Sequence, residues 1–191
     1  MTARLPFVVA LASVFASTMA GCAAAPAKPA PSTPSHLRHP LAMVTANLGP
    51  ASGTLVSGKL TLATVEGGVR ITGDIGGLGR NSTHGIHIHE RGDCSAADGS
   101  SAGGHFNPAG AAHGRAGATA HHLGDMDNIV ADANGIAHVS WQIDGVMLGT
   151  GAANDIVGRA IVVHANPDDY ATQPSGNSGQ RVACGVIRMG E

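Results

Sequence analysis

The chain has 191 residues, a formal net charge of −2 and only 13% charged residues. This balance and an aromatic content of 3% argue against nucleic acid as a partner, which requires clustered basic and aromatic side chains. Eleven histidines in so weakly charged a chain indicate metal binding instead, because imidazole nitrogens are ligands of zinc and copper.

The N-terminal segment has the features of an export signal. Arg4 precedes an apolar run over residues 5–16, which is too short to span a bilayer as a helix. Small residues then directly precede Cys22, as in the motif at which bacterial lipoproteins are cut and acylated. We expect residues 1–21 to be a signal peptide of lipoprotein type, with Cys22 as the lipidation site. An ordinary signal peptide cut nearby is the alternative, and both readings export the protein to the periplasm or cell envelope.

Residues 22–40 are rich in alanine and proline and have almost no large apolar side chain to bury. This composition predicts an extended tether rather than a domain. His36 and His39 lie in the tether, and we expect them to be solvated; capture of metal is the alternative. The remaining residues, 41–191, are enough for one domain with one core.

Alternation of apolar and polar residues predicts β-strands in the rest of the chain. The segments that show it are 44–48, 59–62, 69–75 and 138–142. Gly67-Gly68 and Asn134-Gly135 supply hairpin turns that tolerate positive φ. Since the chain has 28 glycines and no convincing amphipathic helix, we expect an all-β sandwich or flattened barrel.

Two long stretches fit no strand pattern, residues 91–127 and 165–180. Loops of this length are uncommon in a compact domain unless they are functional or pinned. Cys94 lies in the first stretch and Cys184 shortly after the second. With Cys22 set aside for lipid, these two cysteines form an even pair, which favours a disulfide in an oxidising compartment. Two buried unpaired thiols are the alternative.

Two groups of histidines have the spacing of metal ligands. Residues i and i+2 of a strand point to the same side, so His87 and His89 emerge together while their isoleucine neighbours enter the core. His164 adds an imidazole at the end of another strand. The first long stretch supplies three imidazoles and one carboxylate, which complete the closed tetrahedral pattern of structural zinc. These four residues are His105, His113, His122 and Asp125.

Four motifs follow one another along the chain. They are His84-Gly-Ile-His87-Ile-His89-Glu90-x-Gly92-Asp93-Cys94, Ser101-Ala-Gly-Gly-His105-Phe-Asn-Pro108, His122-x-Gly-Asp125 and Arg181-Val-Ala-Cys184-Gly-Val-Ile187. In residue type, order and spacing they resemble the copper,zinc superoxide dismutase family over essentially all of residues 41–190. The resemblance is closest to the exported bacterial branch, in which the cysteine follows soon after the Gly-Asp pair.

The resemblance implies a Greek-key antiparallel β-barrel or sandwich that holds one copper and one zinc ion per subunit, as a monomer or a homodimer. The implied copper ligands are His87, His89, His105 and His164. The implied zinc ligands are His105, His113, His122 and Asp125, so that the imidazole of His105 bridges the two metals. His121 in place of His122 is the alternative for one zinc position.

Further positions match residues that surround the metals in the family. Asp168 matches a carboxylate that bonds one ligand of each metal, here His87 and His113, and so fixes their orientation. His84 matches a position that bonds the backbone near the copper site. His138 lies on the polar face of its strand and is expected to be solvated.

The implied activity is the dismutation of superoxide to dioxygen and hydrogen peroxide, which protects the cell envelope. Arg181 matches the arginine that overlooks the open copper position, where a guanidinium can attract the superoxide anion. His105 is implied to release copper and take up a proton in one half-reaction and to return that proton in the other. Arg181 and His105 are therefore the implied catalytic residues.

One feature departs from the eukaryotic members of the family. The second long stretch contains two aspartates but no lysine or glutamate, so the charged guides found there are absent. Steering of the substrate must then rest on Arg181, the metals and charges elsewhere, such as Arg91 or Arg115.

Two other functions fit part of the pattern. A non-catalytic periplasmic carrier of copper or zinc needs ligands but has no use for Arg181 or an open copper position. A zinc hydrolase needs a general base beside a three-ligand site, whereas the zinc set here is closed and Glu90 lies in the other motif. Arg181 and Asp168 therefore favour the dismutase.

Overall fold

The computed structural model describes residues 43–190. The predicted signal peptide, the tether with His36 and His39, and the predicted lipidation site Cys22 lie outside the described residues. Among residues 43–190, no helix has the length and apolar character that crossing a bilayer requires.

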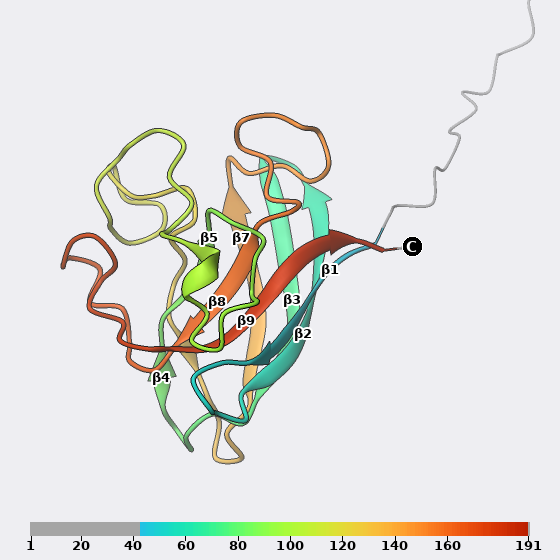
Figure 1. Cartoon of the computed structure of the whole chain (residues 1–191). Helices are drawn as coiled ribbons and strands as arrows, with labels where there is room; N and C mark the ends of the chain where they lie inside the picture. Colours follow the sequence, from blue (N-terminus) through green and yellow to red (C-terminus); the bar gives the residue numbers. More distant parts are fainter. Residues whose placement is uncertain (1–42, 191) are drawn as a thin grey trace, which may run out of the picture. The chain divides into compact units, whose positions relative to one another are not determined.

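The described part of the chain is all-β, as predicted, with one turn of 3₁₀ helix (Figure 1). The strands are β1 (Val44–Pro50), β2 (Ser57–Val65), β3 (Gly68–Gly76), β4 (Thr83–His84), β5 (Ile86–His89), β6 (Ile129–Val130), β7 (Ala137–Asp144), β8 (Ala160–His164) and β9 (Arg181–Met189). The 3₁₀ turn, η1, covers Ser100–Ala102.

Seven of the strands form one curled antiparallel sheet in the order β5-β8-β9-β1-β2-β3-β7 (Figure 1). The short strands β4 and β6 pair separately. The chain passes from β3, near one end of this order, through β4 to β5 at the other end. It then returns through β6 to β7, which lies beside β3. Crossovers of this kind are the Greek-key arrangement that the resemblance implied.

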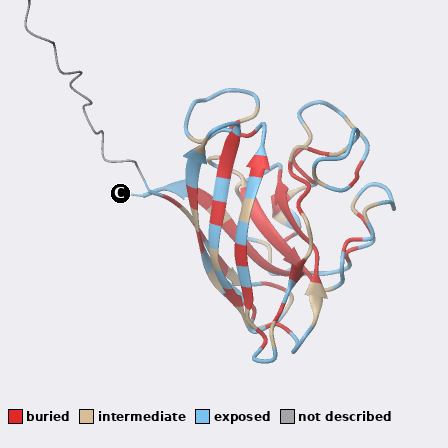
Figure 2. Cartoon of the chain, turned by 180° about the vertical axis from the view of Figure 1, so that it is seen from behind, coloured by how far each residue is buried: buried red, intermediate tan, exposed pale blue. Residues whose placement is uncertain are grey.

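The predicted alternation sets the register of the sheet. Val44 and Ala46 of β1 lie opposite Leu62 and Leu60 of β2, and all four side chains are buried in the core. Figure 2 shows the result as bands of buried and exposed residues that alternate along the strands. A one-residue slip would turn each buried set to solvent, so the pattern fixes the pairing.

The two predicted turns differ in what they connect. Gly67, with φ 82°, lies in the tight connection between the paired strands β2 and β3. Gly135, with φ 78°, lies in a turn before β7, but the strand before that turn, β6, pairs with β4 and not with β7. The turn at Gly135 is therefore present as predicted, but the two strands that flank it do not pair as a hairpin.

The two long loops fall where the sequence placed them. One connects β5 to β6 and the other fills residues 165–180 between β8 and β9. The first loop packs over β8 and β9 (Figure 1). Ala102 of this loop belongs to a small buried cluster with Val162 of β8 and Cys184 of β9. Both loops thus begin or end at the strands that contain the predicted metal ligands.

Candidate metal centre

Strand β5 turns its two histidines away from the core. Ile86 and Ile88 pack into the main core, whereas His87 and His89 point to the opposite side and are buried there. His164 ends the neighbouring strand β8, just after an irregularity in its pairing with β9. Nε2 of His89 lies 3.4 Å from Nε2 of His164.

His105 completes a group of four imidazoles with these residues. One nitrogen from each ring lies within 4.8 Å of the corresponding nitrogens of the other three, and all four side chains are buried. Nδ1 of His87 and Nε2 of His105 are buried without any hydrogen-bond partner. Buried polar atoms are rarely left unpaired, so an electron-pair acceptor such as a metal ion fits this space.

The second group lies directly beside the first. Oδ1 of Asp125 is 2.8 Å from Nδ1 of His105, 3.0 Å from Nδ1 of His113 and 3.3 Å from Nδ1 of His122. Nδ1 of His122 is 3.4 Å from Nδ1 of His105. Zinc–nitrogen bonds of about 2.0–2.1 Å in a tetrahedron give edges of about 3.3 Å, so the four atoms fit one small cation.

His105 belongs to both groups and offers a different nitrogen to each. Its Nδ1 faces Asp125, while its Nε2 has no protein partner and belongs to the group of four imidazoles. A single imidazole ring thus stands between two candidate metal positions.

Acceptor-only partners fix which nitrogen of each surrounding histidine remains available. The carboxylate of Asp168 lies 2.8 Å from Nε2 of His87 and 2.9 Å from Nε2 of His113. A carboxylate oxygen can only accept, so both rings donate at Nε2, which leaves Nδ1 of His87 without a partner and directs Nδ1 of His113 toward Asp125. His89 is set the other way, because its Nδ1–H donates to the carbonyl of Gly103 at 2.9 Å and its Nε2 stays free. The free nitrogens are the ones that converge.

The electrostatics favour the protonation states that bind metal. Burial lowers the pKa of His87 to about 4 and that of His164 to about 3. Burial alone would raise the pKa of Asp125, but hydrogen bonds from His105, Gly114 and His122 lower it well below its ordinary value. At neutral pH His87 and His164 are therefore neutral imidazoles and Asp125 is an ionised carboxylate, which are the protonation states that bind metal.

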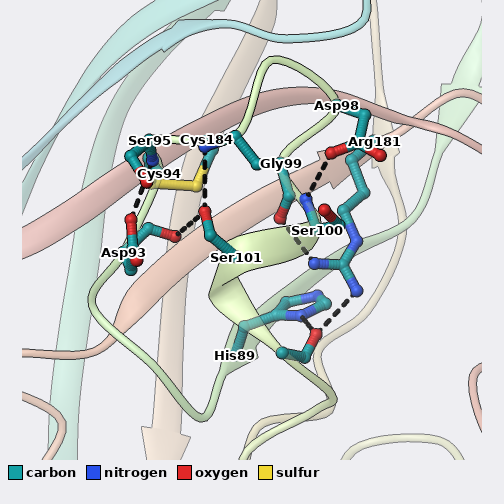
Figure 3. Close-up of a disulfide and its surroundings, with 12 residues drawn as sticks. His89, Asp93, Cys94, Ser95, Asp98, Gly99, Ser100, Ser101, Arg181 and Cys184 are labelled. Atoms are coloured by element: carbon teal, nitrogen blue, oxygen red, sulfur yellow. Dashed lines mark hydrogen bonds between the residues drawn. A yellow bond between two sulfur atoms is a disulfide. The ribbon is translucent and has the colours of Figure 1, made fainter.

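Arg181 lies at the first position of β9, next to the group of four imidazoles. Its Nη1 donates to the carbonyl of Gly99 and its Nη2 to the carbonyl of Gly103, both at 2.6 Å (Figure 3). Cys94 and Cys184 form a disulfide with a Cα–Cα distance of 5.7 Å, which ties the start of the loop to β9. The sequence prediction of a disulfide is therefore correct.

The other three histidines of residues 43–190 fall outside the two groups. The ring of His121 donates from Nδ1 to the carbonyl of His122, so it is His122 that joins the zinc-type group. His84 on β4 bonds the carbonyl of His164 at 2.8 Å, beside the group of four imidazoles. His138 is exposed and lies 2.7 Å from Asp74 on the outer face of the sheet.

The two arginines considered for steering are each paired with a carboxylate. Arg91 lies 3.5 Å from Glu90, and Nε of Arg115 lies 2.7 Å from Asp127. Their fields are therefore partly cancelled, in contrast to that of Arg181, whose guanidinium contacts two carbonyl oxygens and no carboxylate within salt-bridge distance among the described residues.

Sequence reasoning missed three residues that hold the site together. The carbonyl of Gly103 accepts from both His89 and Arg181. The side chain of Asn128 pairs with both the N–H and the C=O of Asp168, at 2.8 and 2.9 Å, and that of Gln173 does the same to His113. A main-chain carbonyl or a carboxamide side chain has no characteristic spacing in the sequence, unlike a set of metal ligands. The Gly103-Gly104 pair before His105 is the one sequence feature that marks this position.

Comparison with known proteins gives a consistent result. The family model described as copper/zinc superoxide dismutase matches residues 56–187. "Superoxide dismutase [Cu-Zn] 2" of Aquifex aeolicus is 43% identical over 136 residues, which are 70% of this chain and 80% of that protein. "Superoxide dismutase [Cu-Zn]" of Caulobacter vibrioides is 42% identical over 137 residues, 69% of this chain and 78% of its own length.

Solved structures share the fold. A double mutant of a SOD-like protein from Bacillus subtilis superposes with a TM-score of 0.70 at 35% identity, covering 77% of this chain and 99% of its own. The clock protein EA4 gives a TM-score of 0.68 at 36% identity, covering 78% of this chain and 94% of its own.

Proposed function

Since this chain belongs to the copper/zinc superoxide dismutase family, we propose that it converts superoxide to dioxygen and hydrogen peroxide with one copper and one zinc ion. His87, His89, His105 and His164 hold copper, and His105, His113, His122 and Asp125 hold zinc. The position of His105 supports this most directly, because one buried ring offers a nitrogen to each of two adjacent ligand groups.

Copper supplies one-electron redox chemistry when it is bound, and zinc supplies a fixed positive charge. Two superoxide anions and two protons give one dioxygen and one hydrogen peroxide. Nε2 of His105 has no protein partner, so this atom can hold a proton and deliver it to the reduced substrate. Asp125 fixes the other nitrogen of the same ring and so keeps Nε2 pointing into the site.

Arg181 attracts and orients the anion. Its two bonds to loop carbonyls use two of the five N–H groups of the guanidinium and leave the others for substrate. Burial is the main cause of the low pKa of His164, and the positive charge of Arg181 adds to it, which indicates that this charge is felt at the copper ligands. A site with fixed donors and a permanent charge suits a small anion that offers little else to recognise.

The experiment is metal analysis and superoxide decay on purified residues 22–191. We expect one copper and one zinc per chain and rapid, catalytic loss of superoxide. His164→Ala should lose copper and activity, whereas His138→Ala, an exposed histidine outside both groups, should retain them. A protein that holds both metals and leaves superoxide untouched would be a carrier, and the proposal would be wrong.

Export and anchoring are a further part of the proposal. Residues 1–21 act as a lipoprotein signal, Cys22 is acylated, residues 22–40 form the tether, and residues 41–191 form the enzyme domain in the periplasm or cell envelope. The small residues before Cys22 and the Cys94–Cys184 disulfide, which suits an oxidising compartment, support this. Mass spectrometry of the mature N-terminus tests it, with Cys22→Ser as the control that removes the lipid. The domain acts as a monomer or a homodimer, which sedimentation analysis of the same material distinguishes.

A further inference from the structure

His113 lies in a part of the metal-binding loop without regular structure. Residues 106–124 form no helix or strand. The N–H and C=O of His113 therefore lack a ladder partner, although its side chain is buried and nearly every buried main-chain group in a protein is paired. The main-chain position of this zinc ligand must be fixed by something outside its own loop.

One side chain from the other loop supplies both bonds. The N–H of His113 donates to Oε1 of Gln173 at 2.8 Å, and Nε2 of Gln173 donates back to the carbonyl of His113 at 2.9 Å. Nε2 also lies 3.2 Å from the carbonyl of Ala171, which fixes the orientation of the amide. The carboxamide thus takes the place of a neighbouring strand.

The same segment also reaches the imidazole of His113. Oδ1 of Asp168 accepts from Nε2 of His113 at 2.9 Å. Gly176 packs so closely on this bond that a Cβ there would collide with Asp168 and His113. Residues 168–176 therefore hold His113 from two sides, by the ring through Asp168 and by the main chain through Gln173.

The other zinc-group residues are held by other means. His105 forms a β-bridge with His89. His122 and Asp125 form their own turn, in which the N–H of Asp125 donates to the carbonyl of His122 at 3.0 Å and the N–H of His122 donates to the carboxylate of Asp125 at 2.7 Å. Only His113 depends for its main chain on a single side chain of the 165–180 loop.

We propose that Gln173 is a positioning residue for the zinc site: its carboxamide holds the main chain of His113 so that Nδ1 stays directed at the metal. The inference rests on the proposed zinc role of His113. Without the two bonds, the loop around His113 opens more often, and each opening removes one of four ligands. Zinc release should accelerate about tenfold, the effect expected from losing hydrogen bonds of ordinary net strength. Among residues 43–190 the side chain of Gln173 is hydrogen-bonded only to His113 and Ala171, and to no histidine of the copper group except through them, so copper retention should not change.

The test compares Gln173→Leu with Gln180→Leu in the copper- and zinc-loaded protein. Gln180 is exposed on the same loop, and its side chain makes no hydrogen bond among residues 43–190, which makes it the matched control. The readouts are the rate of zinc transfer to a chromogenic chelator, the copper content, and the visible spectrum of cobalt placed in the zinc position. We expect faster zinc release and an altered cobalt spectrum for Gln173→Leu alone, with copper content unchanged.

A second variant separates the two bonds. Gln173→Glu keeps an acceptor for the His113 N–H but turns a carboxylate oxygen toward the His113 carbonyl, so zinc release should again be faster than in the parent. If the parent binds zinc and both Gln173 variants release it at the parent rate, the positioning role is overturned while the zinc site stands. If the parent binds no zinc, the proposed site and this inference fall together.

Discussion

His89 and Arg181 are hydrogen-bonded to the same atom, the carbonyl oxygen of Gly103 (Figure 3). The imidazole donates from Nδ1 at 2.9 Å and the guanidinium from Nη2 at 2.6 Å. Gly103 has φ 75°, and a Cβ there would collide with Glu90, so this position favours glycine. One loop carbonyl therefore positions both a proposed copper ligand, His89, and the arginine that we propose attracts substrate, Arg181.

Replacement of Arg181 should separate catalysis from metal binding. Arg181→Ala is expected to leave copper and zinc content unchanged and to lower the dismutation rate at least about tenfold. Charge attraction of about 4 kcal/mol at about 4 Å and an effective dielectric near 20 is the upper guide to the loss. The dismutation rate of Arg181→Lys should fall between those of the parent and Arg181→Ala. Lysine retains the positive charge but loses the fixed orientation that hydrogen bonds to two carbonyl groups give the guanidinium.

The matched control is Arg188→Ala, an exposed arginine on the same strand. Metal analysis and stopped-flow decay of superoxide measure both effects. Equal rates for metal-loaded Arg181→Ala and parent would show that Arg181 does not guide the anion.

The dismutation rate should fall as ionic strength rises. In the proposed mechanism Arg181 and the metals attract superoxide electrostatically, and added salt shortens the range of this attraction. Arg91 and Arg115 are already paired with carboxylates, so Arg91→Ala and Arg115→Ala should leave the slope almost unchanged. Stopped-flow decay across a salt series measures it, and a flat profile would contradict electrostatic guidance.

The sequence predicted the framework of the site because that framework depends on periodicity. Alternation along β5 placed His87 and His89 on one side and the isoleucines on the other, and the structure has this arrangement. The even pair of cysteines predicted the disulfide that is present. These features follow from residue type and spacing alone.

Other features depend on tertiary contacts that spacing does not encode. The acceptor shared by His89 and Arg181 is a main-chain carbonyl, which every residue has, so no residue type marks it. The partner of His113 is Gln173, separated by 60 residues, and its contact exists only because two loops meet. The sequence predicts the turn at Gly135, but not that the strand before it, β6, pairs with β4 and not with β7.

Removal of Asp125 should release zinc before copper. Its Oδ1 faces the three histidines of the zinc group, and its Oδ2 accepts from the N–H groups of Gly114 and His122. Asp125→Ala therefore loses both a ligand and the anchor of the loop, and residues 95–125 should be cleaved faster by protease. Asp127→Ala is the control, because Asp127 pairs only with Arg115 at the surface. Equal protease resistance of Asp125→Ala and parent would show that zinc does not order this loop.

Loss of the disulfide should affect both stability and activity. Closing a loop of 90 residues is worth roughly 4.6 kcal/mol in the chain-entropy model, an upper guide to what Cys94→Ser with Cys184→Ser would cost. The bridge also anchors the loop whose Gly99 carbonyl binds Arg181, so the metal-loaded double variant should be a slower dismutase. Urea unfolding and superoxide decay measure the two effects. If the double variant were less stable but equally active, the disulfide would stabilise the fold without helping to position Arg181.

The metal-free protein should lose stability as pH falls from about 6.5 toward 4. Burial lowers the pKa of His87 to about 4 and of His164 to about 3, against 6.5 in the unfolded chain. In this window the unfolded state binds more protons than the folded state, so acid favours unfolding. Above pH 6.5 these histidines are neutral in both states, so the free energy of unfolding is not reduced by their protonation.

Urea unfolding of the metal-free protein between pH 8 and pH 4.5 measures the slope. Each buried histidine contributes at most about 1.4 kcal/mol per pH unit within its window. His164→Gln should reduce the slope by up to that amount, because glutamine does not titrate. A parent whose free energy of unfolding is constant between pH 6.5 and 4.5 would show that His87 and His164 are not held neutral by burial.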